Sequence, residues 1–174
     1  MLKLEPATIA RLRDRLKAAG ERPSVFATDL SKIVAGGDVP AEVLARFDAL
    51  CEAMFLMAAA DGKLEESEID TLRGAIRELS EGGVRSVQIA AMVKGAQERF
   101  GKEGLKARLA AVANHLKTDR DSAEATFICA AAIAFADDDI DDTENEVLND
   151  LADALEIDGD RAETLLDELQ ADGD

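Results

Sequence analysis

Apolar residues recur at helical spacing along almost the whole chain. The longest such pattern runs from Ala41 to Ala60, with apolar side chains every three or four residues, at Val43, Phe47, Leu50, Cys51, Met54, Met57 and Ala58. This spacing places one side of a helix in a protein core. The same pattern predicts helices over about 66–79, 85–100 and 105–117. With only three prolines and no tyrosine, the composition also favours an all-α protein.

Two further helices are predicted before residue 36. The first opens at Pro6 and carries the apolar stripe Ile9, Leu12 and Leu16, and the second spans about 24–35 with Phe26, Leu30, Ile33 and Val34. The run Gly36-Gly37-Asp38-Val39-Pro40 is the clearest break in the chain. We therefore divide the chain into an N-terminal helical extension, residues 1–37, and an all-α domain, residues 38–174.

The domain contains an internal repeat. A shift of 76 residues superposes 49–93 on 125–169 without a gap, so the repeats cover about 41–100 and 122–171. The identical pairs are Ala49/Ala125, Ala58/Ala134, Ala60/Ala136, Asp61/Asp137, Glu68/Glu144, Leu72/Leu148, Leu79/Leu155, Gly83/Gly159 and Arg85/Arg161. The pattern predicts two three-helix units joined by the bridging helix 105–117.

The helices that end near Ala60 and Ala136 are apolar on nearly all sides close to their C-termini. Such helices must be buried on most sides. We expect them to pack against each other at the centre, related by a pseudo-twofold axis. Whether the loops that follow them lie together or at opposite ends depends on the crossing of the two helices, which the sequence leaves open.

The charge of the chain is strongly negative and uneven. The formal net charge is −17, and residues 137–174 hold 17 acidic side chains against the single basic Arg161. Such a field repels nucleic acid and attracts cations or basic proteins. No apolar run is long enough to cross a bilayer. Without a signal-like start, we expect a cytoplasmic protein in which Cys51 and Cys129 are buried free thiols.

Carboxylates are concentrated in the two loops that follow the apolar helices. The second loop puts six of them into the nine residues 136–144, and the first holds four acids within 61–68. Carboxylate oxygens are the ligands that hard divalent cations prefer. The candidate metal ligands are Asp61, Glu65, Glu68, Asp137, Asp139, Asp141 and Glu144. The candidate cations are Ca²⁺ and Mg²⁺, with Mn²⁺ as a third.

Helix capping explains part of this acidity without a metal. Asp141-x-x-Glu144 fits a capping box, and Glu65-x-x-Glu68 fits it less well because Glu is a poor N-cap. Capping does not explain Asp61 and Asp137, which follow helix C-termini, where the helix dipole disfavours a carboxylate. The run 137–139 adds repulsion between neighbouring acids that a divalent cation would relieve.

Other metal sites do not fit the sequence. The first loop resembles the second half of an EF-hand, but Met57 and Ala59 stand where that motif needs oxygen ligands. The only histidine, His115, lies in the bridging helix, and no Glu-x-x-His sequence is present, which argues against zinc and di-iron sites. His115 is better explained as a helix-end or packing residue.

The duplicated loop carries a resemblance to a known family. Two copies of an apolar helix, then Ala-Asp-(Gly/Asp)-x-(Leu/Ile)-(Glu/Asp)-x-(Ser/Thr)-Glu, then an amphipathic helix, resemble the tellurite-resistance TerB-like family. The resemblance covers about 39–170. It implies an all-helical fold of two pseudo-symmetric units, a cytosolic protein of bacterial stress response, and metal chelation by loop acids. At matching positions these are Asp61, Glu65 and Glu68, then Asp137, Asp141 and Glu144.

Three functional hypotheses follow from the sequence. The first is a non-catalytic TerB-type protein that binds divalent cations through its two acidic loops in a stress- or tellurite-resistance role. The second is a helical adaptor whose acidic face docks a basic protein, or its own basic N-terminal helix, without metal. The third, an enzyme, is disfavoured because the sequence has no phosphate-binding glycine loop and no nucleophile beside a histidine. We therefore predict no catalytic and no organic-cofactor residues.

Overall fold

The computed structural model describes residues 41–62, 64–80, 84–136 and 141–171, and all regular structure in these ranges is helical. The first predicted repeat comprises α3 (Ala41–Ala58), α4 (Glu66–Leu79) and α5 (Ser86–Glu103). The predicted bridging helix is α6 (Leu105–Leu116). The second predicted repeat comprises α7 (Arg120–Ala134), α8 (Asp142–Ala154) and α9 (Gly159–Ala171). The predicted all-α class is confirmed, whereas the boundary near residue 37 lies outside the described residues.

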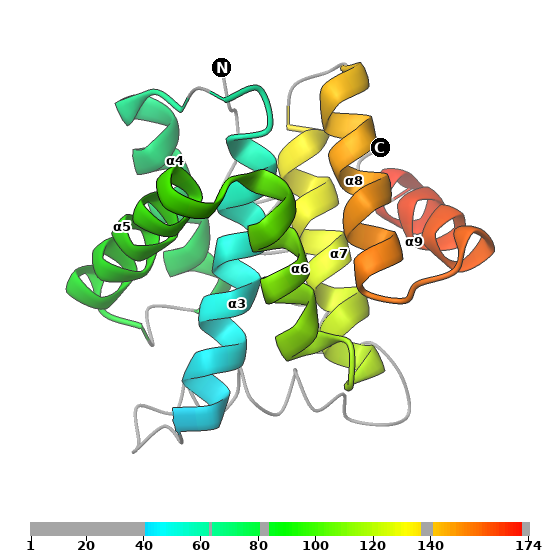
Figure 1. Cartoon of the computed structure of the whole chain (residues 1–174), viewed down its shortest axis with the longest axis horizontal. Coiled ribbons are helices and arrows are strands. Elements are labelled where there is room, and N and C mark those ends of the chain that lie inside the picture. The colour runs from blue at the N-terminus through cyan, green and yellow to red at the C-terminus, as the bar shows by residue number, and fades with distance from the viewer. Residues whose placement is uncertain (1–40, 63, 81–83, 137–140, 172–174) are drawn as a thin grey trace.

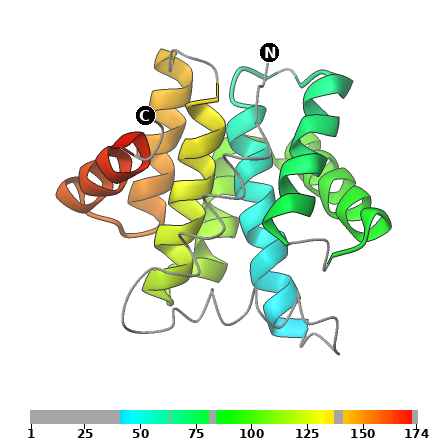
Figure 2. The same ribbon diagram turned by 180° about the vertical axis from the view of Figure 1, so that it is seen from behind.

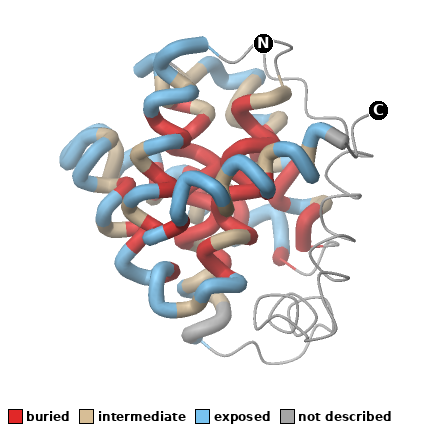
Figure 3. The backbone as a smooth tube through the Cα atoms, turned by 90° about the vertical axis from the view of Figure 1, so that its right-hand side faces the viewer, coloured by how far each residue is buried: buried red, intermediate tan, exposed pale blue. Residues whose placement is uncertain are grey.

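Helices α3 and α7 pack against each other at the centre of the molecule, as the sequence predicts (Figures 1 and 2). Both are buried on nearly all sides towards their C-termini, and the buried part of the chain runs through the middle of Figure 3. Helix α7 places the alanines 130–132 and Ala134 in this core. Small side chains let two helix backbones approach closely. The centre is therefore an alanine-rich helix pair.

The other helices cover this pair on two sides. Helix α6 packs on α3 and also contacts α8, so it joins the two repeats as a bridge. Helices α4 and α5 pack together beside α3, and α8 and α9 each pack on α7 (Figure 1). Each outer helix buries one stripe, such as Leu72, Ile76 and Leu79 of α4, and leaves its other face in water.

The two central helices run in the same direction. Figures 1 and 2 place the C-terminal ends of α3 and α7, and the N-terminal ends of α4 and α8, at one end of the molecule. The two acidic loops therefore leave the core at this same end. This answers the question that the sequence leaves open, and we call this end the acidic edge, formed in the described chain by Asp61, Glu65 and Glu68 of the first loop and Asp141 and Glu144 of the second.

Equivalent helices of the two repeats share several boundaries. Helix α3 ends at Ala58 and α7 at Ala134, and α4 begins at Glu66 and α8 at Asp142, so both pairs are offset by 76 residues. The helices predicted over 66–79 and 105–117 match α4 and α6 to within one residue. The helix predicted over 85–100 continues three residues further, to Glu103. The pseudo-twofold relation itself stays a prediction.

The turn after α8 is closed by a residue in the left-handed conformation. Glu156 has φ 60°, its N–H donates to the Asp153 carbonyl at 3.1 Å, and the Ile157 N–H donates to the Ala152 carbonyl at 2.9 Å. These two bonds form a Schellman motif, in which glycine is the usual left-handed residue. Because Glu156 carries a Cβ, its backbone conformation is strained.

We expect Glu156→Gly to stabilise the protein. Relief of the left-handed strain is worth about 1–2 kcal/mol, and the greater freedom of glycine in the unfolded chain offsets about half of that gain. The free energy of unfolding from urea denaturation should therefore rise by about 0.5–1 kcal/mol. Glu156→Ala is the control, since it removes the carboxylate but keeps the Cβ. A gain of equal size in Glu156→Ala would show that charge and not backbone strain is responsible.

Candidate functional site

The first acidic loop leaves α3 through a turn that requires glycine. Gly62 has φ 86°, and its N–H donates to the Ala59 carbonyl at 2.8 Å. No atom lies within 4 Å of the position that a Cβ would take, so the backbone angle and not crowding demands glycine here. The turn holds Asp61, which is exposed, directly beyond the end of the buried helix.

Glu65 and Glu68 lie at the start of α4. The Glu65 N–H donates to Glu68 Oε2 at 2.8 Å, which is the return bond of a capping box. Glu65 is exposed and Glu68 is half-buried. The sequence prediction that capping operates here is therefore confirmed for the Glu68 side chain, one oxygen of which is engaged by the backbone.

The second loop ends in a complete capping box. The Glu144 N–H donates to Asp141 Oδ1 at 2.7 Å, and the Asp141 N–H donates to Glu144 Oε2 at 3.2 Å. The capping box predicted from Asp141-x-x-Glu144 is therefore confirmed. Both carboxylates also lie at the positive end of the α8 dipole, which stabilises their charge.

The carboxylates of the acidic edge occupy different positions. Glu68, Asp141 and Glu144 each use an oxygen to cap a helix, and Glu65 faces Glu68 in the α4 capping box. Asp61 is exposed in the first loop. The other two predicted ligands, Asp137 and Asp139, lie outside the described residues. Within the part of the chain that the structure describes, no three carboxylates, thiols or imidazoles already form a metal-ligand group.

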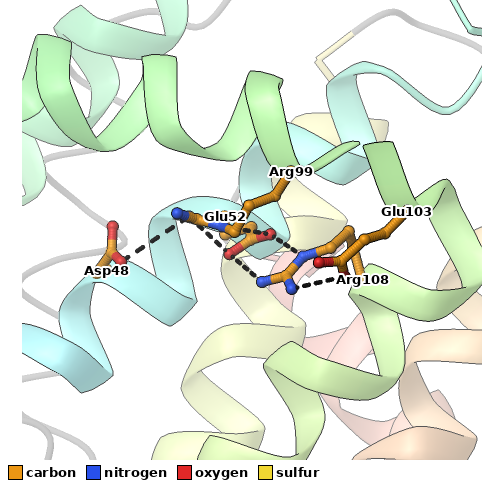
Figure 4. Close-up of polar contacts among 5 residues, drawn as sticks. All are labelled: Asp48, Glu52, Arg99, Glu103 and Arg108. Carbon is orange, nitrogen blue, oxygen red and sulfur yellow. Dashed lines mark hydrogen bonds and ion pairs between the residues drawn. The ribbon is translucent and has the colours of Figure 1, made fainter. Parts of the chain in front are cut away.

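A buried ionic cluster, which the sequence analysis missed, lies among α3, α5 and α6 (Figure 4). The Glu52 carboxylate is only 4% exposed. Its Oε2 accepts from Arg99 Nη2 at 2.9 Å and from Arg108 Nη2 at 3.0 Å, and its Oε1 accepts from Arg108 Nε at 2.7 Å. Arg108 also donates to Glu103 Oε2 at 2.9 Å, and Arg99 lies 4.0 Å from Asp48. We call these five residues the Glu52 cluster.

The Glu52 cluster neutralises its buried charge internally. The Glu52 carboxylate raises the pKa of the Arg108 guanidinium by hydrogen bonding, so that arginine stays charged at all relevant pH values. Burial raises the pKa of Asp48, and the nearby Arg99 opposes this effect. No oxygen of Glu52 faces open water, so the cluster joins three helices and offers little to a ligand.

A hint of this cluster is visible in the sequence. Glu52 is the only charged residue between Ala49 and Ala60, inside an otherwise apolar helix. The equivalent position in the second repeat is Ile128, which is buried. A lone carboxylate on a buried face requires a cationic partner, but which arginine supplies it depends on tertiary packing.

A small cleft lies where α7 begins and the α8–α9 turn passes, at the end of α8 away from the acidic edge. Its volume is about 170 Å³, and Lys117, Arg120, Glu124 and Arg161 line it. Arg161 donates to both oxygens of Glu124, at 2.8 and 2.9 Å, and Arg120 Nε donates at 3.2 Å. The Arg161 hydrogen bonds lower the pKa of Glu124. Lys117 lies 3.7 Å from Glu156, so the basic groups of the cleft have acidic partners, and the Arg161–Glu124 pair connects α9 to α7.

The two thiols are buried and unpaired, as the sequence predicts. Burial raises the pKa of Cys129 to about 12 and raises that of Cys51 well above its usual range. Only the thiolate is nucleophilic, so neither sulfur is suited to redox or nucleophilic chemistry. His115 is exposed in the last turn of α6, where a basic residue suits the helix dipole.

We expect both thiols to be unreactive in the folded protein. An aromatic disulfide reagent at pH 8 should titrate neither Cys51 nor Cys129 until denaturant is added, and then both. Because the folded pKa values exceed those of the unfolded chain, neutral thiols favour folding below pH about 9, and stability should decline as pH rises above it. The double variant Cys51→Ala/Cys129→Ala should lose this alkaline decline. Rapid labelling of native protein would contradict the burial.

No helix among the described residues is long and apolar enough to cross a membrane. A family model described as "Tellurite resistance protein TerB" matches residues 47–166. The match begins in α3 and ends in α9, so it includes both acidic loops and the bridging helix. Comparisons with curated proteins and with solved structures gave no match.

Proposed function

Because the chain belongs to the TerB family of tellurite-resistance proteins, with the family model matching well over half of its length, we propose that it is a non-catalytic cation-binding protein. Its site is the acidic edge, where the two interhelical loops bind divalent cations. The proposed setting is the cytoplasm, in a stress- or tellurite-resistance role. The observation that carries the proposal is the common direction of α3 and α7, which brings both loops to one end (Figure 1).

Electrostatics supports this assignment. Two carboxylates 4 Å apart repel by about 1 kcal/mol in water and about 4 kcal/mol at an effective dielectric of 20. The run 137–139 places three of them in sequence, and the first loop carries Asp61 and Glu65. Helix dipoles stabilise Glu68, Asp141 and Glu144 at helix N-termini but disfavour carboxylates that follow helix C-termini, as Asp61 and Asp137 do in the sequence. A bound cation would offset that repulsion.

The ligand set contains oxygen donors alone, which favours Ca²⁺ or Mg²⁺, with Mn²⁺ as the third candidate. We assign direct coordination to Asp61, Glu65, Asp137 and Asp139. Glu68, Asp141 and Glu144 hold the first turns of α4 and α8 in place and complete the proposed ligand set. Mutating a cap should therefore lower helix stability as well as weaken binding, whereas Asp61→Asn should weaken binding without removing a helix cap.

Isothermal titration calorimetry of chelator-treated protein with Ca²⁺, Mg²⁺ and Mn²⁺ tests the proposal. Saturable binding is expected for the wild type, and Asp61→Asn/Asp137→Asn should weaken it at least about tenfold, since loss of a charged ligand costs about 1.4 kcal/mol or more. Asp160→Asn/Glu163→Gln on α9 is the matched control, which removes two charges elsewhere. Equal weakening by the control, or no heat with any cation, would sink the proposal.

A second candidate function rests on the surface of α8 and α9. Residues 141–170 contain 12 acidic side chains and one basic one, Arg161, which Glu124 already neutralises. A surface of one charge sign attracts oppositely charged partners and speeds their association. The alternative is therefore an adaptor that docks a basic protein on this face without metal.

The two candidate functions depend on different charged residues, so substitutions can distinguish them. Charge reversal on α9, Glu163→Lys/Asp167→Lys, should abolish retention on a basic peptide column if the adaptor function holds, while calorimetric cation binding persists. Asp61→Asn/Asp137→Asn should give the opposite pattern. Retention that both variants leave unchanged would exclude the adaptor.

A further inference from the structure

An apolar groove lies between the first half of α3 and the middle of α5, away from the acidic edge. Its volume is about 390 Å³, and Ala41, Leu44, Ala45, Ala91 and Met92 line it, with Asp48 and Arg99 at one end. Ala41, Ala45 and Ala91 are exposed, and Leu44 and Met92 are half-buried. The groove is open to solvent, and apolar side chains line most of it.

The exposed apolar surface continues along α5. Val87 is 81% exposed and lies one helical turn before Ala91. Single apolar side chains are normal on a protein surface, but Val87 lies on the same face of α5 as the exposed Ala91 and extends the apolar surface of the groove. Among the described residues, Val87 is the one large hydrophobic side chain that stands fully in water.

We propose that this groove is the docking site of the chain's own segment 24–35. The sequence of this segment predicts a short helix whose stripe is Phe26, Leu30, Ile33 and Val34. A 12-residue helix is too short to be stable alone, so its stripe needs an apolar surface to pack on. The α3–α5 groove supplies such a surface.

The short connection between segment 24–35 and the groove favours this segment over a separate partner. Residues 36–40 separate the segment from Ala41, which itself lines the groove. Five residues span up to about 17 Å, and a 12-residue helix is about 18 Å long. Gly36 and Gly37 allow the chain to reverse, so the segment can return along the first turns of α3. A short tether also gives an effective concentration of the order of millimolar, which no separate partner matches.

Electrostatic attraction also favours docking of the N-terminal segment on the rest of the chain. Residues 1–22, which precede the segment, carry six basic side chains against three acidic ones, whereas the whole chain has net charge −17. At the groove end, Asp48 lies 4.0 Å from Arg99, so these two charges offset each other. The net negative charge of the body therefore attracts the basic N-terminal arm while the apolar stripe of 24–35 fills the groove.

A spin-label experiment on the full chain tests the proposal. Because Cys51 and Cys129 are buried, Ser31→Cys provides a single reactive thiol for a nitroxide label. The methyl signal of Met92 in methionine-labelled protein reports the groove. Docking predicts that the label broadens this signal and that adding Phe26→Asp/Leu30→Asp restores it. Thr28→Asp, which adds a charge on the opposite side of the predicted helix, is the matched control and should leave the broadening intact.

The remaining outcomes overturn the proposal. If Met92 keeps its full intensity in the labelled wild-type background, the segment does not occupy the groove. If broadening arises only when spin-labelled, isotope-free protein is mixed with label-free, methyl-labelled protein, the occupant is a second copy of the chain. If Phe26→Asp/Leu30→Asp and Thr28→Asp behave alike, the apolar stripe is not what docks. None of these readouts depends on cation binding.

Discussion

Glu52→Ala should lower the free energy of unfolding by about 3–5 kcal/mol, because removal of one partner from a buried ionic cluster leaves uncompensated charge. The variant would leave two guanidinium groups, those of Arg99 and Arg108, without their shared carboxylate. Arg108 is the more costly of the two, since its side chain is only 14% exposed. As domains are stable by about 5–15 kcal/mol, such a loss should be plain in urea denaturation followed by circular dichroism.

Two further variants test whether the loss of stability comes from the Glu52 cluster. Glu146→Ala on α8 removes an exposed carboxylate and should change stability by less than about 0.5 kcal/mol. Glu52→Leu/Arg99→Met/Arg108→Met removes all the strongly coupled charges and should recover much of the loss, because apolar replacements of a buried ion pair are often tolerated. A Glu52→Ala protein as stable as the wild type would show that the Glu52 cluster does not hold α3, α5 and α6 together.

Ca²⁺ or Mg²⁺ should raise the melting temperature of the chelator-treated protein. At a free cation concentration of 100 times Kd, binding stabilises the folded state by about 2.7 kcal/mol. For a chain of this size that corresponds to a shift of roughly 5–11 °C, measured by differential scanning calorimetry. The shift should increase with cation concentration and reverse with chelator.

The melting temperatures of variants show which residues are responsible for the cation-dependent shift. Asp61→Asn/Asp137→Asn should raise the melting temperature without cation, because it relieves repulsion, and should nearly abolish the cation-dependent shift. Asp160→Asn/Glu163→Gln should keep the full shift. A shift that monovalent salt reproduces at equal ionic strength would indicate general screening of the net charge and contradict a specific site.

The helices and their order could be predicted from the sequence because each has an apolar stripe at helical spacing. The repeat offset of 76 residues, the central pairing of α3 with α7 and the capping by Asp141 and Glu144 also depend on local or repeated patterns. Burial of both cysteines follows from their place among apolar neighbours. In each case the residues that decide the outcome are close together in the sequence.

Features that depend on contacts between distant helices could not be predicted in this way. The shared direction of α3 and α7 depends on how α6 crosses from one repeat to the other. The partners of Glu52 lie 47 and 56 residues further along the chain, so no local pattern pairs them. The left-handed Glu156 occupies a position where glycine would be expected, and its sequence offers no turn signal beyond Gly159.

Paramagnetic Mn²⁺ titration followed by amide NMR can show whether the two loops share one cation site. Below one equivalent, Mn²⁺ should broaden the signals of residues 61–65 and of Asp141 and Asp142 together. Signals from the equally acidic α8–α9 turn at Glu156–Asp158 should persist, since α8 holds that turn about 20 Å from the acidic edge. Broadening spread evenly over α8 and α9, or confined to one loop, would contradict a cation site built from both loops.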